Sequence, residues 1–168
     1  RDYVLKIDQP GQDAPLLNVF GGKLTTYRRL AEHALEKIGE AIGSRGGPWT
    51  ANSRLPGGDF PATAYAAEVQ ALTKAYGFLK REHAERLVRC YGTDARSILG
   101  NAARPEDMGR HFGGSLYECE VRWLIEREWA CNAEDVLWRR TKQGLFLSAG
   151  EAAELETYMA AAAASGAV

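Results

Sequence analysis

Residues 16–30 read LLNVFGGKLTTYRRL and join a short apolar run, two glycines and the start of an amphipathic helix. The apolar run at 16–20 has the length and composition of a β-strand. Gly21 and Gly22 can take backbone conformations that let a ligand approach the main chain closely. The first amides of the helix that follows have no partner within the helix, so they attract an anion. The sequence therefore predicts an anion or cofactor site between Gly21 and Thr26.

The residues before this stretch predict a strand that pairs with it. Residues 3–7, YVLKI, are rich in strand-forming side chains, and residues 10–13, PGQD, have the composition of a turn. Two strand-like runs joined by a turn predict a β-hairpin or two adjacent strands ahead of the glycines.

Downstream of Thr26 the apolar residues recur at a spacing of three and four, which is typical of helices. The clearest helix runs to Ile42 and is followed by a turn-rich loop that reaches Pro61. Further helices are expected at 63–75, 80–91, 94–99, 115–128, 133–139 and 148–163. Predicted caps are the Ser148/Glu151 capping box and Thr93-Asp94. The sequence therefore predicts a mainly α fold, a compact multi-helix domain preceded by a short β-hairpin.

The run WRRTK at 138–142 leaves two interpretations open. Its three cations could meet a phosphate, an anionic lipid or an acidic partner. They could also simply end a helix, whose last carbonyls carry partial negative charge, and this second interpretation is favoured. The tryptophans expected in the helical core are Trp123, Trp129 and Trp138.

Composition excludes several classes of function. A chain of 168 residues with 45% hydrophobic and 26% charged residues is typical of a soluble globular protein of one domain. Its formal net charge of -1 argues against a dedicated nucleic-acid binder. Three cysteines without CxxC spacing favour a reducing cytosol over a disulfide framework or a zinc site. No histidine has metal-ligand spacing with a carboxylate, so neither a metal site nor a catalytic histidine is expected in this chain.

Lys23 lies between the paired glycines and the two threonines. A cation there could reach a phosphate, a carboxylate or a reduced cofactor, while the helix amides act from the other side. Thr25 or Thr26 would then cap the helix or bond to the ligand. The alternative is an ordinary strand-to-helix turn with an exposed lysine, and the residues alone leave both open.

Four segments carry a resemblance to a known family: RDY at 1–3, VFGGKLTTYRRLAEHALEKI at 19–38, GGPWTANSRLPGGDF at 46–60 and YECEVRWLIEREWACNAEDVLWRRTKQGLFL at 117–147. In this order they closely resemble the carboxy-terminal part of FAD-dependent, aerobic-type glycerol-3-phosphate dehydrogenases. The resemblance covers nearly the whole chain. It implies that residues 1–26 are the end of an FAD-binding domain and that 27–168 form a helical C-terminal domain.

In activity, the resemblance implies oxidation of sn-glycerol 3-phosphate to dihydroxyacetone phosphate, with electrons passed through FAD to a membrane quinone. It implies substrate-binding roles for Arg1 and Lys23. The residues that it places at the flavin are Gly21, Gly22, Lys23, Leu24, Thr25 and Thr26. The catalytic base would lie outside this chain, so the isolated chain is expected to be inactive and to bind FAD weakly.

The resemblance also implies a cytoplasmic enzyme that is peripheral on the cytoplasmic membrane, and it leaves a homodimer open. Two other functions stay open as well. The chain could be a non-catalytic helical module for protein interaction or membrane docking, or it could be part of a related α-glycerophosphate oxidase that uses oxygen.

Overall fold

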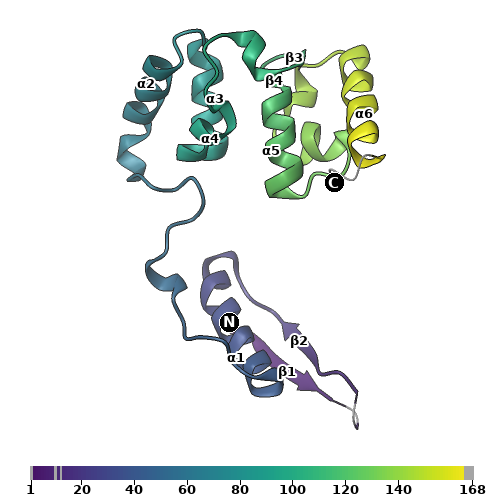
Figure 1. Ribbon diagram of the computed structural model, residues 1–168. Helices are drawn as coiled ribbons and strands as arrows, with labels where there is room; N and C mark the ends of the chain where they lie inside the picture. Colours follow the sequence, from purple (N-terminus) through teal and green to yellow (C-terminus); the bar gives the residue numbers. More distant parts are fainter. Residues whose placement is uncertain (1, 10, 12, 165–168) are drawn as a thin grey trace. The chain divides into compact units, whose positions relative to one another are not determined.

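The structure, a computed structural model, describes residues 2–9, 11 and 13–164 (Figure 1). Its contacts divide the chain into two compact units, 1–54 and 55–168. The helix that follows the glycines therefore groups with the hairpin. The division after residue 26 stays a prediction about the domains of a parent enzyme.

The first unit begins with the predicted hairpin. Strands β1 (Val4–Asp8) and β2 (Leu16–Phe20) pair antiparallel, with Leu5 opposite Val19 and Ile7 opposite Leu17. Opposed residues share a face of the hairpin, so these four apolar side chains lie together on one face.

A 3₁₀ turn, η1 (Leu24–Thr26), leads into helix α1 (Tyr27–Ile42), which packs beside the hairpin (Figure 1). The Tyr3 hydroxyl and His33 Nδ1 lie 2.5 Å apart and connect the residue before β1 to the helix. The helix ends at Gly43, whose φ of 88° favours glycine. A second 3₁₀ turn, η2 (Thr50–Asn52), lies near the end of the unit.

None of the described residues of the first unit is buried. Large apolar side chains stay exposed on the hairpin, on α1 and in the loop that follows α1, among them Val4, Leu16, Phe20, Leu35, Ile42 and Trp49. A two-stranded hairpin with one helix is marginal without further packing. The first unit therefore has no hydrophobic core of its own.

The second unit is helical and confirms the mainly α fold (Figure 1). Its elements are η3 (Ala62–Ala64), α2 (Tyr65–Ala75), α3 (Arg81–Tyr91), η4 (Gly92–Asp94), α4 (Ala95–Leu99), η5 (Pro105–Met108), β3 (His111–Gly113), β4 (Leu116–Tyr117), α5 (Glu118–Glu128), the π-helix η6 (Asp135–Arg140), η7 (Gln143–Leu145) and α6 (Ala149–Ala164).

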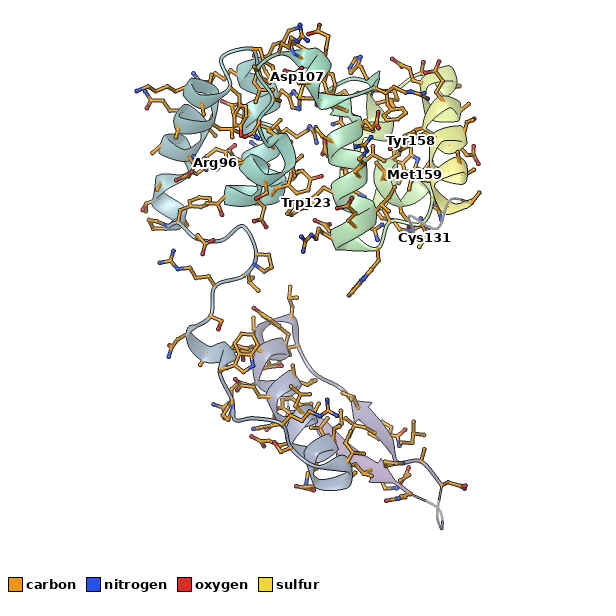
Figure 2. All side chains as sticks on the ribbon, viewed as in Figure 1. Arg96, Asp107, Trp123, Cys131, Tyr158 and Met159 are labelled. Atoms are coloured by element: carbon orange, nitrogen blue, oxygen red, sulfur yellow. The ribbon has the colours of Figure 1, made fainter. Side chains whose placement is uncertain are left out.

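A single core runs through this unit from α2 to α6 and includes the fully buried Leu72, Phe112 and Leu124. Figure 2 shows Tyr158 and Met159 on the side of α6 that faces α5. The Tyr158 hydroxyl donates a hydrogen bond to the carboxylate of Glu118 at the start of α5. The second unit therefore has the packed interior that the first unit lacks.

A buried ion pair connects α3 to α5 inside this core. The Arg86 guanidinium binds both carboxylate oxygens of Glu120 at 2.6 Å, and Glu120 is only 2% exposed. The Tyr91 hydroxyl donates to Glu120 at 2.7 Å, and Arg86 also donates to the hydroxyl and the carbonyl of Ser115. A buried carboxylate needs hydrogen-bond and charged partners of this kind, because an unpaired buried charge is strongly destabilising.

Two of the predicted helices differ from the structure. The helix expected from Ser115 begins only at Glu118, because Leu116 and Tyr117 pair with β3 in a short second hairpin. The segment predicted as a helix at 133–139 is mainly the π-helix η6.

The predicted capping box at α6 is confirmed, since the Ser148 amide donates to Glu151 at 2.7 Å. The cap predicted at Thr93-Asp94 is wrong, because no side chain caps α4. The Thr93 amide donates to the Gly57 carbonyl at 3.0 Å instead.

The expectation for the tryptophans was correct only in part. Trp123 packs against the core, whereas Trp129 is 84% exposed and Trp138 is 43% exposed. Trp129 follows the last residue of α5 with a left-handed φ of 53°, so its side chain does not continue the helical repeat on which the prediction relied.

Candidate functional site

The segment from Gly21 to Thr26 connects β2 to α1. Gly21 and Gly22 have φ values of 80° and 108°, a region that residues with side chains rarely adopt. A Cβ on Gly22 would also lie 2.9 Å from Cδ1 of Leu30 in α1. Both glycines are therefore required by the turn, and Gly22 lets the loop lie against the helix.

Lys23 and Thr26 are joined by three hydrogen bonds. The Lys23 amide donates to Thr26 Oγ1 at 3.1 Å, and Thr26 Oγ1 donates to the Lys23 carbonyl at 3.0 Å. The Thr26 amide donates to the same carbonyl at 2.9 Å. Thr26 thus holds both the amide and the carbonyl of Lys23 by hydrogen bonds.

The side chain of Lys23, by contrast, is exposed, and within the described part of the chain its ammonium group has no hydrogen bond or ion pair. The amides of Leu24 and Thr25 precede the first helical hydrogen bond, so they have no acceptor within the helix. One cation and two such amides therefore lie within three consecutive residues, and all three favour an anion or an electron-rich ring edge.

The structure brings five of the predicted site residues, Gly21 to Thr25, into one exposed loop. Thr26 makes no side-chain cap to α1, and its hydroxyl is bonded to Lys23 instead. Its expected contact with a ligand stays a prediction. Arg1 lies outside the described residues.

The loop could hold an anion or the electron-rich edge of a ring, but not a whole dinucleotide. Its amides and its lysine can face negative charge, and the glycines leave the main chain open. The described residues, however, form only two antiparallel hairpins and helices, and no parallel nucleotide-binding sheet is found among them. These residues could therefore hold one edge of the group and not its adenine or pyrophosphate.

Sequence reasoning missed a polar cluster beside this loop. Arg28 Nη1 donates to Glu32 Oε1 at 2.7 Å, and the Thr50 hydroxyl donates to the same oxygen at 2.6 Å. The hydrogen bond from Thr50 is the main cause that lowers the pKa of Glu32. The Arg28/Glu32 pair has a visible helical spacing of four, but nothing in the sequence indicates the partner Thr50, eighteen residues beyond Glu32.

The same cluster ties the loop after α1 back onto the helix. A groove of about 510 Å³ lies between them, lined in part by Leu35, Ile38, Ile42 and Trp49. Some of the exposed apolar side chains of the first unit therefore line this groove.

Two of the three cations of the 138–142 run bond to carbonyls of helices, in line with the favoured interpretation, and the third does not. The Lys142 ammonium donates to the Trp138 carbonyl in η6. Arg140 donates to the carbonyls of Glu128 and Trp129 at the end of α5, at 2.7 to 3.1 Å. Arg139 pairs with Glu134 and Asp135. Arg139 and Arg140 both lie beside the Asp135 carboxylate, so their charges are compensated locally.

No group of metal-ligating side chains that could hold an ion is found in the described part of the chain. Within the same residues, no helix is both long enough and apolar enough to span a membrane.

Residues 48–165 match a family model described as the C-terminal domain of alpha-glycerophosphate oxidase. The aerobic glycerol-3-phosphate dehydrogenase of Escherichia coli K12 is 45% identical over 161 residues, which cover 95% of this chain and 32% of that protein. The glycerol-3-phosphate dehydrogenase of Pseudomonas aeruginosa is 45% identical, covering 95% of this chain and 31% of that protein. The D-erythritol 1-phosphate dehydrogenase of Brucella abortus is 43% identical, covering 91% and 30%. The chain thus spans about a third of the length of these relatives.

Proposed function

The chain belongs to the family whose model describes the C-terminal domain of alpha-glycerophosphate oxidase, and on this premise we propose that it forms the C-terminal part of a flavin-dependent glycerol-3-phosphate dehydrogenase. The parent enzyme oxidises sn-glycerol 3-phosphate to dihydroxyacetone phosphate. The names of two relatives, each 45% identical to this chain, support this substrate.

The observation that carries the proposal is the Gly21 to Thr26 loop, with its exposed lysine and unpaired first amides. Lys23 holds the substrate phosphate, because an ammonium is a compact charge on a flexible stem. The amides of Leu24 and Thr25 face the flavin edge where negative charge develops. FAD, when bound, supplies the hydride acceptor.

The structure of the first unit supports a division of the parent into two domains. A hairpin and a helix with no buried residue need other chain to cover them, and the flavin-binding domain of the parent is the candidate. The matched family model begins at residue 48, which supports a boundary near Arg54 over one at residue 26.

A second substrate is favoured by one relative. The D-erythritol 1-phosphate dehydrogenase carries a substrate that shares with glycerol 3-phosphate a phosphate on a polyol. A lysine that binds the phosphate suits both substrates. Measurement of kcat/KM of the parent enzyme for glycerol 3-phosphate and for D-erythritol 1-phosphate would show which substrate it prefers.

The electron acceptor is proposed to be a membrane quinone, which also places the parent at the cytoplasmic membrane. The alternative acceptor is oxygen, as the name of the matched family suggests. Production of hydrogen peroxide by the purified parent would favour oxygen, whereas reduction of a soluble quinone without peroxide would favour the quinone.

The experiment that tests the proposal uses the intact parent enzyme and its Lys23→Ala variant. Loss of a charge-assisted contact to phosphate should cost about 1.5–3 kcal/mol, which lowers kcat/KM for glycerol 3-phosphate by about ten- to a hundredfold. Flavin absorbance should stay unchanged, because an exposed lysine supports little packing. Unchanged kcat/KM would remove Lys23 from the site.

The isolated chain provides the second arm. With FAD, glycerol 3-phosphate and a dye acceptor it should give no steady reduction, since it lacks a nucleotide-binding sheet in its described residues. Sustained turnover by the 168-residue chain would contradict the proposal and would favour a self-sufficient catalyst. A parent that neither binds flavin nor oxidises a polyol phosphate would favour the non-catalytic helical module.

A further inference from the structure

The hydroxyl of Thr26 has one hydrogen to donate, and the Lys23 carbonyl receives it at 3.0 Å. Its oxygen also accepts the Lys23 amide at 3.1 Å. A hydroxyl used in this way has no donor left for an anionic ligand. While both bonds to Lys23 are in place, Thr26 therefore has no hydroxyl hydrogen with which to bind an anion.

We propose that Thr26 is a positioning residue of the candidate site and acts by fixing the main chain of Lys23. The inference rests on the proposed function, in which the Lys23 ammonium binds the phosphate of a polyol phosphate. It goes beyond that function, because it gives Thr26 a role without any contact to substrate or cofactor.

Lys23 needs this support because of what precedes it. Gly21 and Gly22 are the residues with the greatest backbone freedom, and the first helical hydrogen bond begins only at the Thr26 amide. The lysine stem is itself flexible. Without the Thr26 hydroxyl, the amide of Lys23 would lose its partner and the origin of the side chain would vary.

The same loop is held from one further direction. Gly22 lies against Leu30, where an added Cβ would be only 2.9 Å from the methyl carbon. The close approach of Gly22 to Leu30 restricts the loop before Lys23, and the hydrogen bonds of Thr26 restrict it after Lys23. Removing the hydroxyl should therefore loosen Lys23 without releasing the whole connection between β2 and α1.

The test compares Thr26→Val, which keeps the shape and removes the hydroxyl, with Thr26→Ser, which restores it, both in the intact parent enzyme. Thr26→Val should raise KM for glycerol 3-phosphate by about tenfold, in line with two lost hydrogen bonds, and change kcat less than about threefold. Thr26→Ser should return KM to within about twofold of the unaltered enzyme. The matched control is Thr157→Val, which removes an exposed hydroxyl bonded to the Ala153 carbonyl in α6.

The decisive comparison is the Lys23→Ala/Thr26→Val double variant. If Thr26 acts through Lys23, the second substitution adds less than about twofold to the effect of Lys23→Ala. If the two substitutions instead changed KM independently, so that their effects multiplied in the double variant, the inference would be overturned. It would also be overturned if Thr26→Val left KM unchanged while Lys23→Ala lowered kcat/KM. If Lys23→Ala itself has no effect, the proposed function fails first.

A readout that does not depend on activity is the amide exchange of the peptide at 20–27. Thr26→Val should speed exchange there, Thr26→Ser should restore it, and Thr157→Val should leave it unchanged. Equal exchange in all four proteins would show that the hydroxyl does not fix the loop, and the inference would be overturned.

Discussion

His83 shows how one partly buried side chain makes the helical unit sensitive to acid. Its ring stacks on that of Tyr117, with centroids 5.8 Å apart, in a region that also contains His111 and the Arg86/Glu120 pair. Burial, followed by the positive charge of Arg86, lowers the pKa of His83 to about 4. The histidine is therefore neutral in the folded protein at pH 7.

This shift predicts a loss of stability in acid. In the unfolded chain the pKa of a histidine is about 6.5, so the unfolded state binds more protons below that pH. The contribution of neutral His83 is fully present above about pH 6.5 and is lost as the pH falls toward 4. Between pH 7 and pH 5 the free energy of unfolding should fall by roughly 1–2 kcal/mol through this group.

Urea denaturation of the wild type and of His83→Gln at the two pH values measures this effect. The variant should show a smaller difference in stability between pH 7 and pH 5. An equal difference in both proteins would assign the acid sensitivity to other groups.

At the same scale, the sequence predicted the local conformation of the candidate site, a strand, a glycine turn and a helix, while the roles of its residues stay predictions. The strand, glycines and helix are neighbours in the chain, so local chemistry was enough to bring Gly21 to Thr25 together. The hydroxyl of Thr26 could not be assigned from the sequence, because a threonine at a helix start can cap, bind a ligand or bond to the residue three before it. Thr50 was missed because its contact with Glu32 depends on the path of a loop.

At the scale of elements, glycines decide how close two segments can lie. The Gly57 carbonyl lies against Gly92, the residue that ends α3, where a Cβ would be only 1.9 Å from that oxygen. This contact accompanies the hydrogen bond from Thr93 to Gly57 and anchors the loop before η3 onto α3. Gly100, which ends α4, has nearly the same backbone angles but nothing within 4 Å of its Cβ position.

These two glycines give a matched pair of variants. Gly100→Ala should cost about 1–2 kcal/mol of unfolding free energy, because its φ of 55° disfavours a side chain. Gly92→Ala has the same strain and an added clash with main chain, so it should cost roughly 2 kcal/mol more. Chemical denaturation of both variants measures the difference. Equal losses would show that the loop moves away without penalty.

The sequence predicted the long helices of the second unit well, because their apolar residues repeat over three or more turns. It missed the hairpin of β3 and β4, since the paired strands are only three and two residues long and lie in a glycine-rich segment. It also could not distinguish the π-helix at 135–140 from an α-helix, because so short a segment carries too little periodicity.

At the scale of the whole molecule, the two units differ in what stabilises them. The second unit has a core of buried apolar residues that extends from Val69 to Met159. The first unit has no buried residue in its described part, and its stability depends on contacts of half-exposed side chains. Local opening is expected where burial is least.

Hydrogen exchange on the 168-residue chain should therefore separate the units. Amides of α1 should exchange at least about a hundredfold faster than those of α3 and α5, because few buried contacts oppose opening of the first unit. Measurement of both sets in the same sample provides the internal control. Equal protection would show that the first unit is stable without a further partner, and it would weaken the assignment to a flavin-binding domain.

The order of these units along the chain has a consequence for biosynthesis. A ribosome makes the coreless hairpin and helix before it makes any residue of the second unit's core. Leu155 and Met159, both almost fully buried, are supplied by α6, the last helix described. The helical unit can therefore complete its hydrophobic core only after residues through Met159 have been made. Until then the nascent chain exposes apolar surface that chaperones can bind.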